Sequence, residues 1–337
     1  MGRKFNSIFV TGGAGYCGSR LVPQLLSLGY KVSVYDIMYF GNSFLPHGNP
    51  NLTLIRGDIR DTKHLRASLG GHDVFISLAC ISNDASFELD ERLSTSVNMD
   101  AFEPMVQAAK ESGIKRFIYA SSSSVYGVSD RSDVTEEHPL VPLTLYNKYK
   151  GLCEPVLKKH TNENFVGVIF RPATVCGYAP RQRLDLSVNI LTNHAVTNNK
   201  ITVFGGSQLR PNLHIQDYCD VVELFLNADD KQIADNIFNV GYENMSIMDI
   251  AKLVKQVVEE VFPEKAPIGI VTTPSDDNRS YHINSDKIQR TLGFRPQHSI
   301  EQAIRDLCDA FRANALPNSM TNDAYYNVRT LKARNVA

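Results

Sequence analysis

The sequence lacks the features that would assign it to a specialised class of protein. Its 337 residues include 35 Lys and Arg against 36 Asp and Glu, so no charge excess indicates a nucleic-acid or membrane partner. No apolar stretch reaches the roughly 18 residues that a membrane-spanning helix needs. Low-complexity runs and internal repeats are also absent. We therefore expect an ordinary soluble globular protein.

Cysteine is scarce and irregularly spaced. The six cysteines, at positions 17, 80, 153, 176, 219 and 308, form no Cys-x-x-Cys pair and no spacing typical of metal ligands. The first residues lead directly into a short strand pattern instead of an export signal. We interpret the cysteines as reduced thiols of a cytoplasmic protein, and we expect no metal site.

Short β-rich segments alternate with helical patterns through the first half of the chain. Strands are expected at residues 7–11, 31–36, 52–55, 73–79, 115–121 and 165–171. Continuous apolar runs, such as residues 74–78, indicate strands covered on both faces, which is typical of a parallel sheet. The sequence therefore predicts an α/β fold with a Rossmann-type, doubly wound parallel sheet.

After about residue 171 the pattern loosens into longer loops, with helices expected at residues 185–197, 246–261 and 299–314. We interpret this half as a smaller C-terminal α/β cap that binds substrate. The predicted division is a main domain of residues 1–170, to which the segment 212–242 returns, and a cap of residues 171–211 and 243–325. Residues 326–337 are polar and basic, and we expect them to form a loosely held tail.

A glycine-rich turn, TGGAGYCG at residues 11–18, follows the first expected strand and opens a helix. Gly13, Gly15 and Gly18 occupy the glycine positions of the G-x-G-x-x-G pattern, which allow close approach of a pyrophosphate at a helix N-terminus. Alone this pattern is weak, because a bare glycine turn has the same letters. The second expected strand, however, ends in Asp36, 18 residues beyond Gly18, where a carboxylate can bind the adenosine ribose. Together the two features predict a dinucleotide site.

Asp36 also bears on which dinucleotide is bound. Its carboxylate would repel the extra phosphate of NADP, and no arginine follows it closely in the sequence, so NAD is favoured. After the third expected strand, Asp58 either lies beside the adenine or caps the helix that begins near Asp61. The sequence leaves both interpretations open.

Tyr146 and Lys150 lie four residues apart at the start of an expected helix and so project from one face. A phenol has a free pKa of about 10, and a nearby ammonium would favour the phenolate, which makes Tyr146 a usable base. The serine run at residues 121–124 ends the fifth expected strand, at the sheet edge where such folds bind ligands. Taken singly these residues would be ordinary surface residues, and the hypothesis depends on their conjunction with the glycine turn.

At this point the chain resembles the extended short-chain dehydrogenase/reductase family, the NAD-dependent sugar-nucleotide epimerase and dehydratase group. The resemblance runs from the glycine turn to about residue 312. Its further markers are GDI (57–59), LAC (78–80), Asn98, SSSSVYG (121–127), YNKYK (146–150), RPATVCG (171–177), FGGSQLRPNLHIQD (204–217), FNVG (238–241) and LGFRP (292–296).

The resemblance implies roles for individual residues. Tyr146 would be the acid/base, Lys150 would assist it and bind the nicotinamide ribose, and Ser122 would bind the sugar oxygen. The expected cofactor-binding residues are Gly12, Gly13, Gly15, Tyr16, Cys17, Gly18, Asp36, Asp58, Ile59, Leu78, Ala79, Asn98, Tyr146 and Lys150. The expected substrate-binding residues are Ser122, Ser123, Thr174, Arg210 and Arg279.

Two departures from the family pattern bear on substrate and reaction. Thr174 stands where family members often have an Asn that holds the substrate diphosphate, and Arg181 or Arg183 is a candidate replacement. Ser123 and Ser124 stand where the dehydratases have an Asp-Glu pair, so dehydration is not expected. The Glu of the decarboxylating branch and the Cys of the 3,5-epimerising branches are missing from this stretch, although Cys80 or Cys176 could lie near the site.

What remains is chemistry at C4, and C4 epimerisation through a transient 4-keto sugar is the first hypothesis. The alternative is a sugar-nucleotide 4-dehydrogenase or 4-ketosugar reductase with a net redox change, and a third possibility is a non-catalytic NAD-binding regulator. The expected partner is a nucleotide-diphosphate sugar. By resemblance we also expect a homodimer, formed through residues 100–112 and 146–160, with Met105, Val106, Leu152 and Val156 as candidate contacts.

Overall fold

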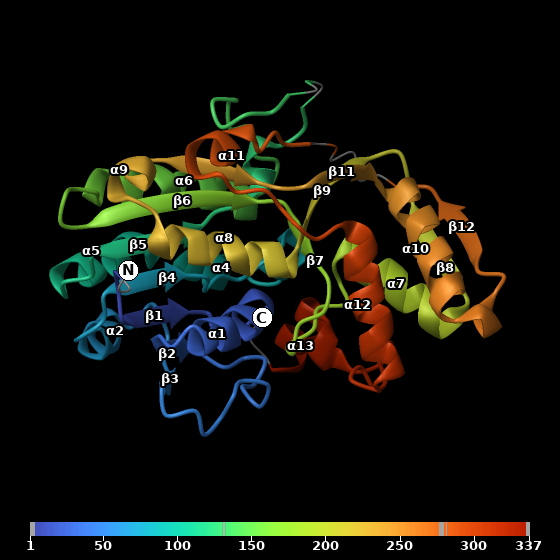
Figure 1. Ribbon diagram of the computed structural model, residues 1–337, viewed down its shortest axis with the longest axis horizontal. Helices are drawn as coiled ribbons and strands as arrows, with labels where there is room; N and C mark the ends of the chain where they lie inside the picture. Colours follow the sequence, from blue (N-terminus) through green and yellow to red (C-terminus); the bar gives the residue numbers. More distant parts are fainter. Residues whose placement is uncertain (1–3, 130, 132, 276–279, 281, 335–337) are drawn as a thin grey trace.

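The computed structural model describes residues 4–129, 131, 133–275, 280 and 282–334. Its largest element is a parallel sheet of seven strands in the order β10-β6-β5-β4-β1-β2-β3 (Figure 1). The strands are β1 (Ser7–Thr11), β2 (Lys31–Asp36), β3 (Leu52–Arg56), β4 (Val74–Ser77), β5 (Arg116–Ala120), β6 (Val166–Pro172) and β10 (Ile237–Val240). Because β2 and β4 flank β1, the strand order reverses there, and doubly wound sheets bind ligands at such a point. The predicted fold class is confirmed.

Helices cover both faces of this sheet because its strands are apolar on both sides. Ile8 and Val10 belong to the apolar core on the face covered by α1 (Tyr16–Ser27) and α8 (Ile215–Asn227). Phe9, between them, belongs to the core on the opposite face. That face is covered by α2 (Thr62–Ser68), α5 (Phe102–Glu111) and α6 (Leu145–His160).

The cap, at the other end of the molecule in Figure 1, has a core of its own. Its strands are β7 (Thr174–Cys176), β9 (Leu209–His214) and β11 (Glu243–Ser246) in one sheet, and β8 (Lys200–Phe204) and β12 (Gly269–Thr273) in another. Three helices pack on one another, α7 (Ser187–Asn198), α10 (Ile247–Val261) and α12 (Ile300–Arg312). Ser246 and Ser299 cap α10 and α12, which explains why the predicted helix starts lie within one residue of the observed ones.

Short elements complete the fold. They are α3 (Asp84–Phe87), α4 (Glu91–Thr95), the π-helical turn η1 (Ser96–Asp100), the 3-10 turn η2 (Ser123–Tyr126), α9 (Asp230–Ile233), the 3-10 turn η3 (Pro263–Lys265), α11 (Asp286–Leu292), the 3-10 turn η4 (Asp323–Tyr325) and α13 (Asn327–Ala333). Among the helices described, none has the combined length and apolarity needed to cross a bilayer.

The expectation of a loosely held tail from residue 326 is wrong for residues 326–334. Asn327–Ala333 form α13, which packs against α3, and Leu331 is buried. The Tyr326 hydroxyl donates a hydrogen bond to the carbonyl of Ser319 at 2.9 Å and accepts one from Asn193 at 3.1 Å. These buried contacts hold the segment, although its composition is polar. Residues 335–337 lie outside the described part of the chain.

Candidate active site

A cavity of about 710 Å³ lies between the large sheet and the cap. Its floor is formed by residues at the carboxyl ends of the parallel strands, including Gly12 after β1, Asp36 at the end of β2 and Leu78 after β4. Residues of the cap, of the loop before α3 and of α13 form the opposite wall. A ligand in the cavity would therefore contact both parts of the molecule.

The glycine turn brings the backbone close to this cavity. Gly12 has φ +73°, and a Cβ there would lie 2.5 Å from the backbone nitrogen of Ala79. A Cβ on Gly18 would lie 2.4 Å from the carbonyl oxygen of Gly13. At Gly15 a Cβ would meet only the carbonyl oxygen of Gly12, at 3.2 Å, and Gly15 lines the cavity. Gly15 therefore leaves open the space that a pyrophosphate would fill.

Not every glycine of the turn is placed for contact with a ligand. Gly13 does not line the cavity, since a Cβ there would lie 2.9 Å from the side chain of Val34. Its missing side chain allows the turn to pack on β2, and direct contact of Gly13 with the cofactor stays a prediction. Gly15 precedes α1 and provides no side-chain cap, so the first N–H groups of this helix remain available to an anion.

Tyr16 and Cys17 both line the cavity at the start of α1. The Tyr16 hydroxyl donates a hydrogen bond to the carbonyl of Gly177 at 2.7 Å and accepts one from Asn189 at 3.2 Å, so it joins α1 to the cap. Burial raises the pKa of Cys17 to about 12, with the Arg183 charge opposing that rise. The thiol of Cys17 therefore stays protonated and uncharged at neutral pH.

Asp36 is positioned by two backbone amides. Its carboxylate accepts hydrogen bonds from Ala14 at 3.0 Å and Met38 at 2.7 Å, and it faces the cavity at the end of β2. Burial raises the pKa of Asp36, and these hydrogen bonds oppose the shift. Asp58 also lines the cavity, but its carboxylate pairs with Arg60.

The structure excludes one of the two interpretations of Asp58, and its place beside the adenine stays a prediction. Asp61, and not Asp58, caps α2, because its side chain accepts a hydrogen bond from the amide of His64 at 3.0 Å. The capping interpretation of Asp58 is therefore wrong.

The other expected cofactor residues divide between the cavity wall and its support. Ile59, Leu78 and Ala79 line the cavity. Asn98 does not, because its side-chain amide is occupied by the backbone of Ile81, which donates a hydrogen bond at 2.8 Å and accepts one at 2.9 Å. These hydrogen bonds hold the loop after β4, and contact between Asn98 and the cofactor stays a prediction.

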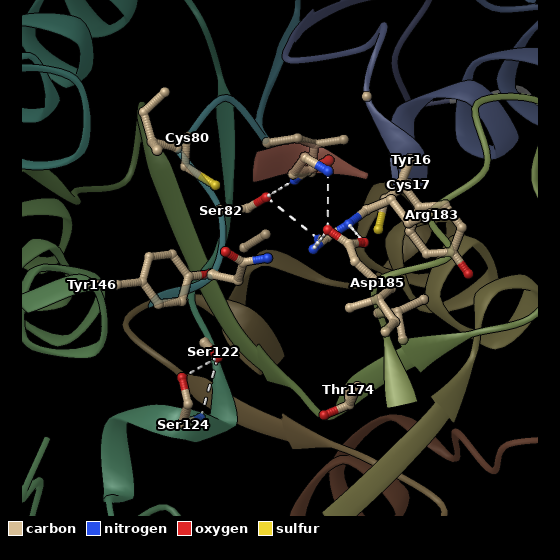
Figure 2. Close-up of a pocket in the computed structure, with 18 of the residues that line it drawn as sticks. Tyr16, Cys17, Cys80, Ser82, Ser122, Ser124, Tyr146, Thr174, Arg183 and Asp185 are labelled. Atoms are coloured by element: carbon tan, nitrogen blue, oxygen red, sulfur yellow. Dashed lines mark hydrogen bonds and ion pairs between the residues drawn. The ribbon is translucent and has the colours of Figure 1, made fainter. Parts of the chain in front are cut away.

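The structure brings Ser122, Tyr146 and Lys150 to one wall of the cavity (Figure 2 shows the first two). Thr144 caps α6 by accepting a hydrogen bond from the amide of Asn147 at 3.3 Å, so the helix begins at Leu145 and its first turn faces the cavity. Lys150 is 6 % exposed, and its ammonium donates a hydrogen bond to the carbonyl of Ala120 at 2.8 Å.

The serine run is tied to α6 through side chains. The Ser122 and Ser124 hydroxyls lie 2.7 Å apart, and Ser124 donates a hydrogen bond to Asn147. Ser121 also lines the cavity, but its hydroxyl donates to Glu154 at 2.6 Å, and Glu154 forms a buried ion pair with Arg171. Ser122 is therefore held in position by a chain of hydrogen bonds that sequence reasoning did not identify.

The expected substrate residues are only partly described. Ser123, Thr174 and Arg210 line the cavity together with Ser122, whereas Arg279 lies outside the described residues. Cys80 lines the cavity, but Cys176 belongs to the core of the cap. All six cysteines are free thiols.

A polar network on the far wall was not predicted from the sequence as a unit. Arg183 forms an ion pair with Asp185 at 2.9 Å, and its guanidinium also lies 3.4 Å from the Ser82 hydroxyl (Figure 2). Asn327 of α13 donates a hydrogen bond from its side chain to Ser82 at 3.0 Å and from its backbone to Asp185 at 3.1 Å. The sequence singled out only Arg183 of this network, as a candidate phosphate ligand. The other members carried no signal, because the network joins segments that are far apart in the sequence.

The fold and the site define a class of enzyme that binds a dinucleotide on a doubly wound sheet and holds a Tyr-x-x-x-Lys pair beside it. The space at Gly15, the uncapped α1 terminus and the Asp36 carboxylate fit the diphosphate and ribose of NAD. Residues 8–241 match the model of the NAD dependent epimerase/dehydratase family. The chain belongs to this family, and it is an NAD-dependent enzyme of the extended short-chain dehydrogenase/reductase type.

Relatives of known name include two kinds of enzyme. The chain is 26% identical over 322 residues to a dTDP-glucose 4,6-dehydratase of Actinoplanes sp., covering 91% of this chain and 98% of the relative. It is 24% identical over 318 residues to a UDP-glucose 4-epimerase of Rhizobium meliloti, covering 88% and 94%. The fold is similar to the crystal structure of a dTDP-glucose 4,6-dehydratase from Streptomyces venezuelae, with a TM-score of 0.80, 24% identity and coverage of 91% and 97%.

Proposed function

We propose that this enzyme is a sugar-nucleotide C4 epimerase that works through a transient 4-keto sugar. The observation that carries the proposal is the wall around Ser122. The two positions after it hold Ser123 and Ser124, and Ser124 is hydrogen-bonded to Ser122 and Asn147. Elimination of water needs a second acid and base besides the tyrosine, and these two hydroxyls do not provide them.

The carboxylates in the rest of the cavity support the same conclusion. Among the described residues, the acids that line it are Asp36, Asp58, Asp84 and Asp185. Asp36 accepts backbone hydrogen bonds, Asp58 pairs with Arg60 and Asp185 pairs with Arg183. The fourth, Asp84, accepts a hydrogen bond from Thr144 at 2.6 Å. Each carboxylate already has a structural partner, which argues against a role in dehydration.

In the proposed reaction Tyr146 accepts the proton of the C4 hydroxyl as a phenolate. The buried Lys150 ammonium and the Arg183 guanidinium both favour that charged form, and Tyr146 is among the groups that raise the pKa of Arg183 against the effect of burial. Ser122 binds the same sugar oxygen and keeps it beside Tyr146. NAD, when bound, supplies the hydride acceptor and donor.

The substrate proposed is a nucleotide-diphosphate sugar, as in the relatives named for dTDP-glucose and UDP-glucose. Thr174 and Arg210 line the cavity from the cap, where they could contact the nucleotide or its diphosphate. This assignment keeps the proposed division into a main domain of residues 1–170 and a substrate cap of residues 171–211 and 243–325.

The test is to follow a sugar nucleotide labelled with deuterium at C4. UDP-, GDP-, CDP- and dTDP-sugars are first screened by NMR for a new anomeric signal. An epimerase returns the hydride that it took, so the labelled product should keep its deuterium and no reduced nicotinamide should accumulate. Transfer of the label to the cofactor in proportion to substrate consumed would show a net dehydrogenase or reductase instead. Loss of water with appearance of a 4-keto-6-deoxy sugar would show dehydration.

The homodimer expected through α5 and α6 stays a proposal, and the structure narrows its contacts. Met105 and Val106 are buried inside the subunit, so they are not available to a partner. Leu152 on α6 is 42% exposed and remains a candidate contact. Light scattering of the enzyme and of Leu152→Glu would test the interface. A cytoplasmic location is likewise proposed, on the basis of the six free thiols.

A further inference from the structure

A buried guanidinium at the dinucleotide end of the cavity has no carboxylate partner among the residues that the structure describes. Arg181 is 4% exposed and lines the cavity. Its side chain donates a hydrogen bond to the side-chain carbonyl oxygen of Asn327 at 2.6 Å, whereas its Nε has no acceptor in the described part of the chain. Within the described ranges of the chain no acid forms an ion pair with it, and Asp185 and Asp36 act only from farther away. A buried cation in this state is costly, so the site is incomplete without an anion.

The position of Arg181 indicates which anion this is. Its backbone N–H donates a hydrogen bond to the Ser19 hydroxyl in α1 at 3.0 Å. Its guanidinium lies over the ring of Phe40, 3.8 Å from the centroid, and Phe40 follows β2 and Asp36. Tyr16 at the start of α1 is also among the groups that act on its charge. Arg181 therefore lies between the start of α1 and the loop that carries Asp36.

We propose that Arg181 is the cation that binds the diphosphate of the dinucleotide, and that Asn327 of α13 positions it. The glycine turn, residues 11–18, contains no lysine or arginine. The N-terminus of α1 supplies only about half a positive charge, against the two negative charges of a diphosphate. A guanidinium fork supplies the missing charge and matches two phosphate oxygens. The inference depends on NAD binding and not on the proposed epimerisation.

Asn327 is suited to this positioning role because it is neutral. Its carbonyl oxygen accepts from Arg181 while its NH₂ group donates to Ser82, so its orientation is set at both ends. A carboxylate in the same place would pair with Arg181 and compete with the ligand. The amide orients the guanidinium and leaves its charge for the dinucleotide. Burial lowers the pKa of Arg181 to about 9.

The first test measures binding by calorimetry without any sugar nucleotide, in Arg181→Met and in the control Arg312→Met. Arg312 lies on α12 with its side chain 59% exposed, outside the cavity. Arg181→Met should bind NAD and ADP-ribose about 10- to 100-fold more weakly, the scale of a charge-assisted pair. Adenosine, which has no phosphate, should bind both variants equally.

Two results would overturn the assignment. Unchanged NAD affinity, or equal weakening of NAD, ADP-ribose and adenosine, would show that Arg181 only supports the fold. Weaker binding of UDP with unchanged binding of ADP-ribose would assign Arg181 to the substrate diphosphate.

The second test is Asn327→Asp, which keeps the shape and the acceptor for Arg181 but replaces the NH₂ donor to Ser82 by a charged oxygen that can accept from the Ser82 hydroxyl. We expect NAD to bind about tenfold more weakly because the new carboxylate neutralises Arg181. The melting temperature of the NAD-free protein should not fall, since the buried cation gains a partner. An unchanged NAD affinity would contradict the positioning role of Asn327.

Discussion

Two glycines three residues apart in the turn should respond in opposite ways to the same added methyl group. Gly15→Ala places its Cβ in the cavity, where it meets only one backbone oxygen, at 3.2 Å. Gly18→Ala places its Cβ 2.4 Å from the carbonyl oxygen and 2.5 Å from the Cα of Gly13. Gly15→Ala should therefore weaken NAD binding with little loss of stability, whereas Gly18→Ala should destabilise the fold.

The distances set the size of each effect. Overpacking costs about 1–3 kcal/mol, and the upper end applies at Gly18 because both opposing atoms are backbone. Replacement of a glycine inside a helix returns about 1 kcal/mol, which leaves a net loss of about 2 kcal/mol. For a chain of this length that lowers the melting temperature by about 3 °C. Gly15→Ala should change stability by less than about 0.5 kcal/mol. It should weaken NAD binding at least about tenfold, because a methyl group displaces the pyrophosphate.

Thermal unfolding without NAD and calorimetry with NAD measure the two effects separately. The unmodified protein is the reference. Gly113→Ala is the control for replacing a glycine outside the cavity, since a Cβ there meets nothing within 4 Å. Gly113 has φ +85°, so this control should lose stability but keep its NAD affinity. Normal NAD affinity in Gly15→Ala would refute the inference that the pyrophosphate lies over this residue.

The remaining predictions concern the catalytic pair and Asp36. Tyr146→Phe should lower kcat at least about a hundredfold while NAD still binds, as checked by turnover and calorimetry; near-normal turnover would remove Tyr146 from the mechanism. Lys150→Met should reduce both kcat and NAD affinity, and loss of only one of them would disprove its double role. Because burial raises the pKa of Asp36 and the ionised form accepts ribose hydrogen bonds, NAD affinity should fall as pH falls through that raised pKa. Asp36→Asn should abolish this dependence. The unmodified protein should prefer NAD to NADP, and Asp36→Ala should narrow the difference, whereas equal affinities in the unmodified protein would contradict the assignment.

The large sheet could be predicted because its signals are local. The expected bounds of β1 and β2 agree with the structure, since each is a short apolar run that ends in a recognisable residue, Thr11 and Asp36. β4 is shorter than the expected 73–79, since the regular strand runs only from Val74 to Ser77, although the backbone of Asp73 still bonds to Ser7 and Arg116. Local periodicity gives the strand, but contacts from elsewhere in the chain set its ends.

Contacts between distant segments account for what could not be predicted at the site. Asn98 has the sequence position of a cofactor residue, yet its amide is used by Ile81. The motif locates Asn98 beside the site but does not show which way its side chain points. The role of Asn327 was not predicted, because a polar residue in a basic segment carries no signal of its own. Its partners also lie far away in the sequence, at positions 82, 181 and 185.

Three parts of the chain line the cavity, and Arg181 and Asn327 join them. Arg181 contacts α1 through Ser19 and α13 through Asn327, while Tyr16 binds the cap at Gly177. A ligand that neutralises Arg181 therefore removes the cost of burying a cation where the main sheet, the cap and the C-terminal helix meet. Since a ligand stabilises the state that binds it, NAD should protect α13 and the loop before α7 from hydrogen exchange as well as the glycine turn. Protection confined to the glycine turn would show that the cap and α13 close independently of the cofactor.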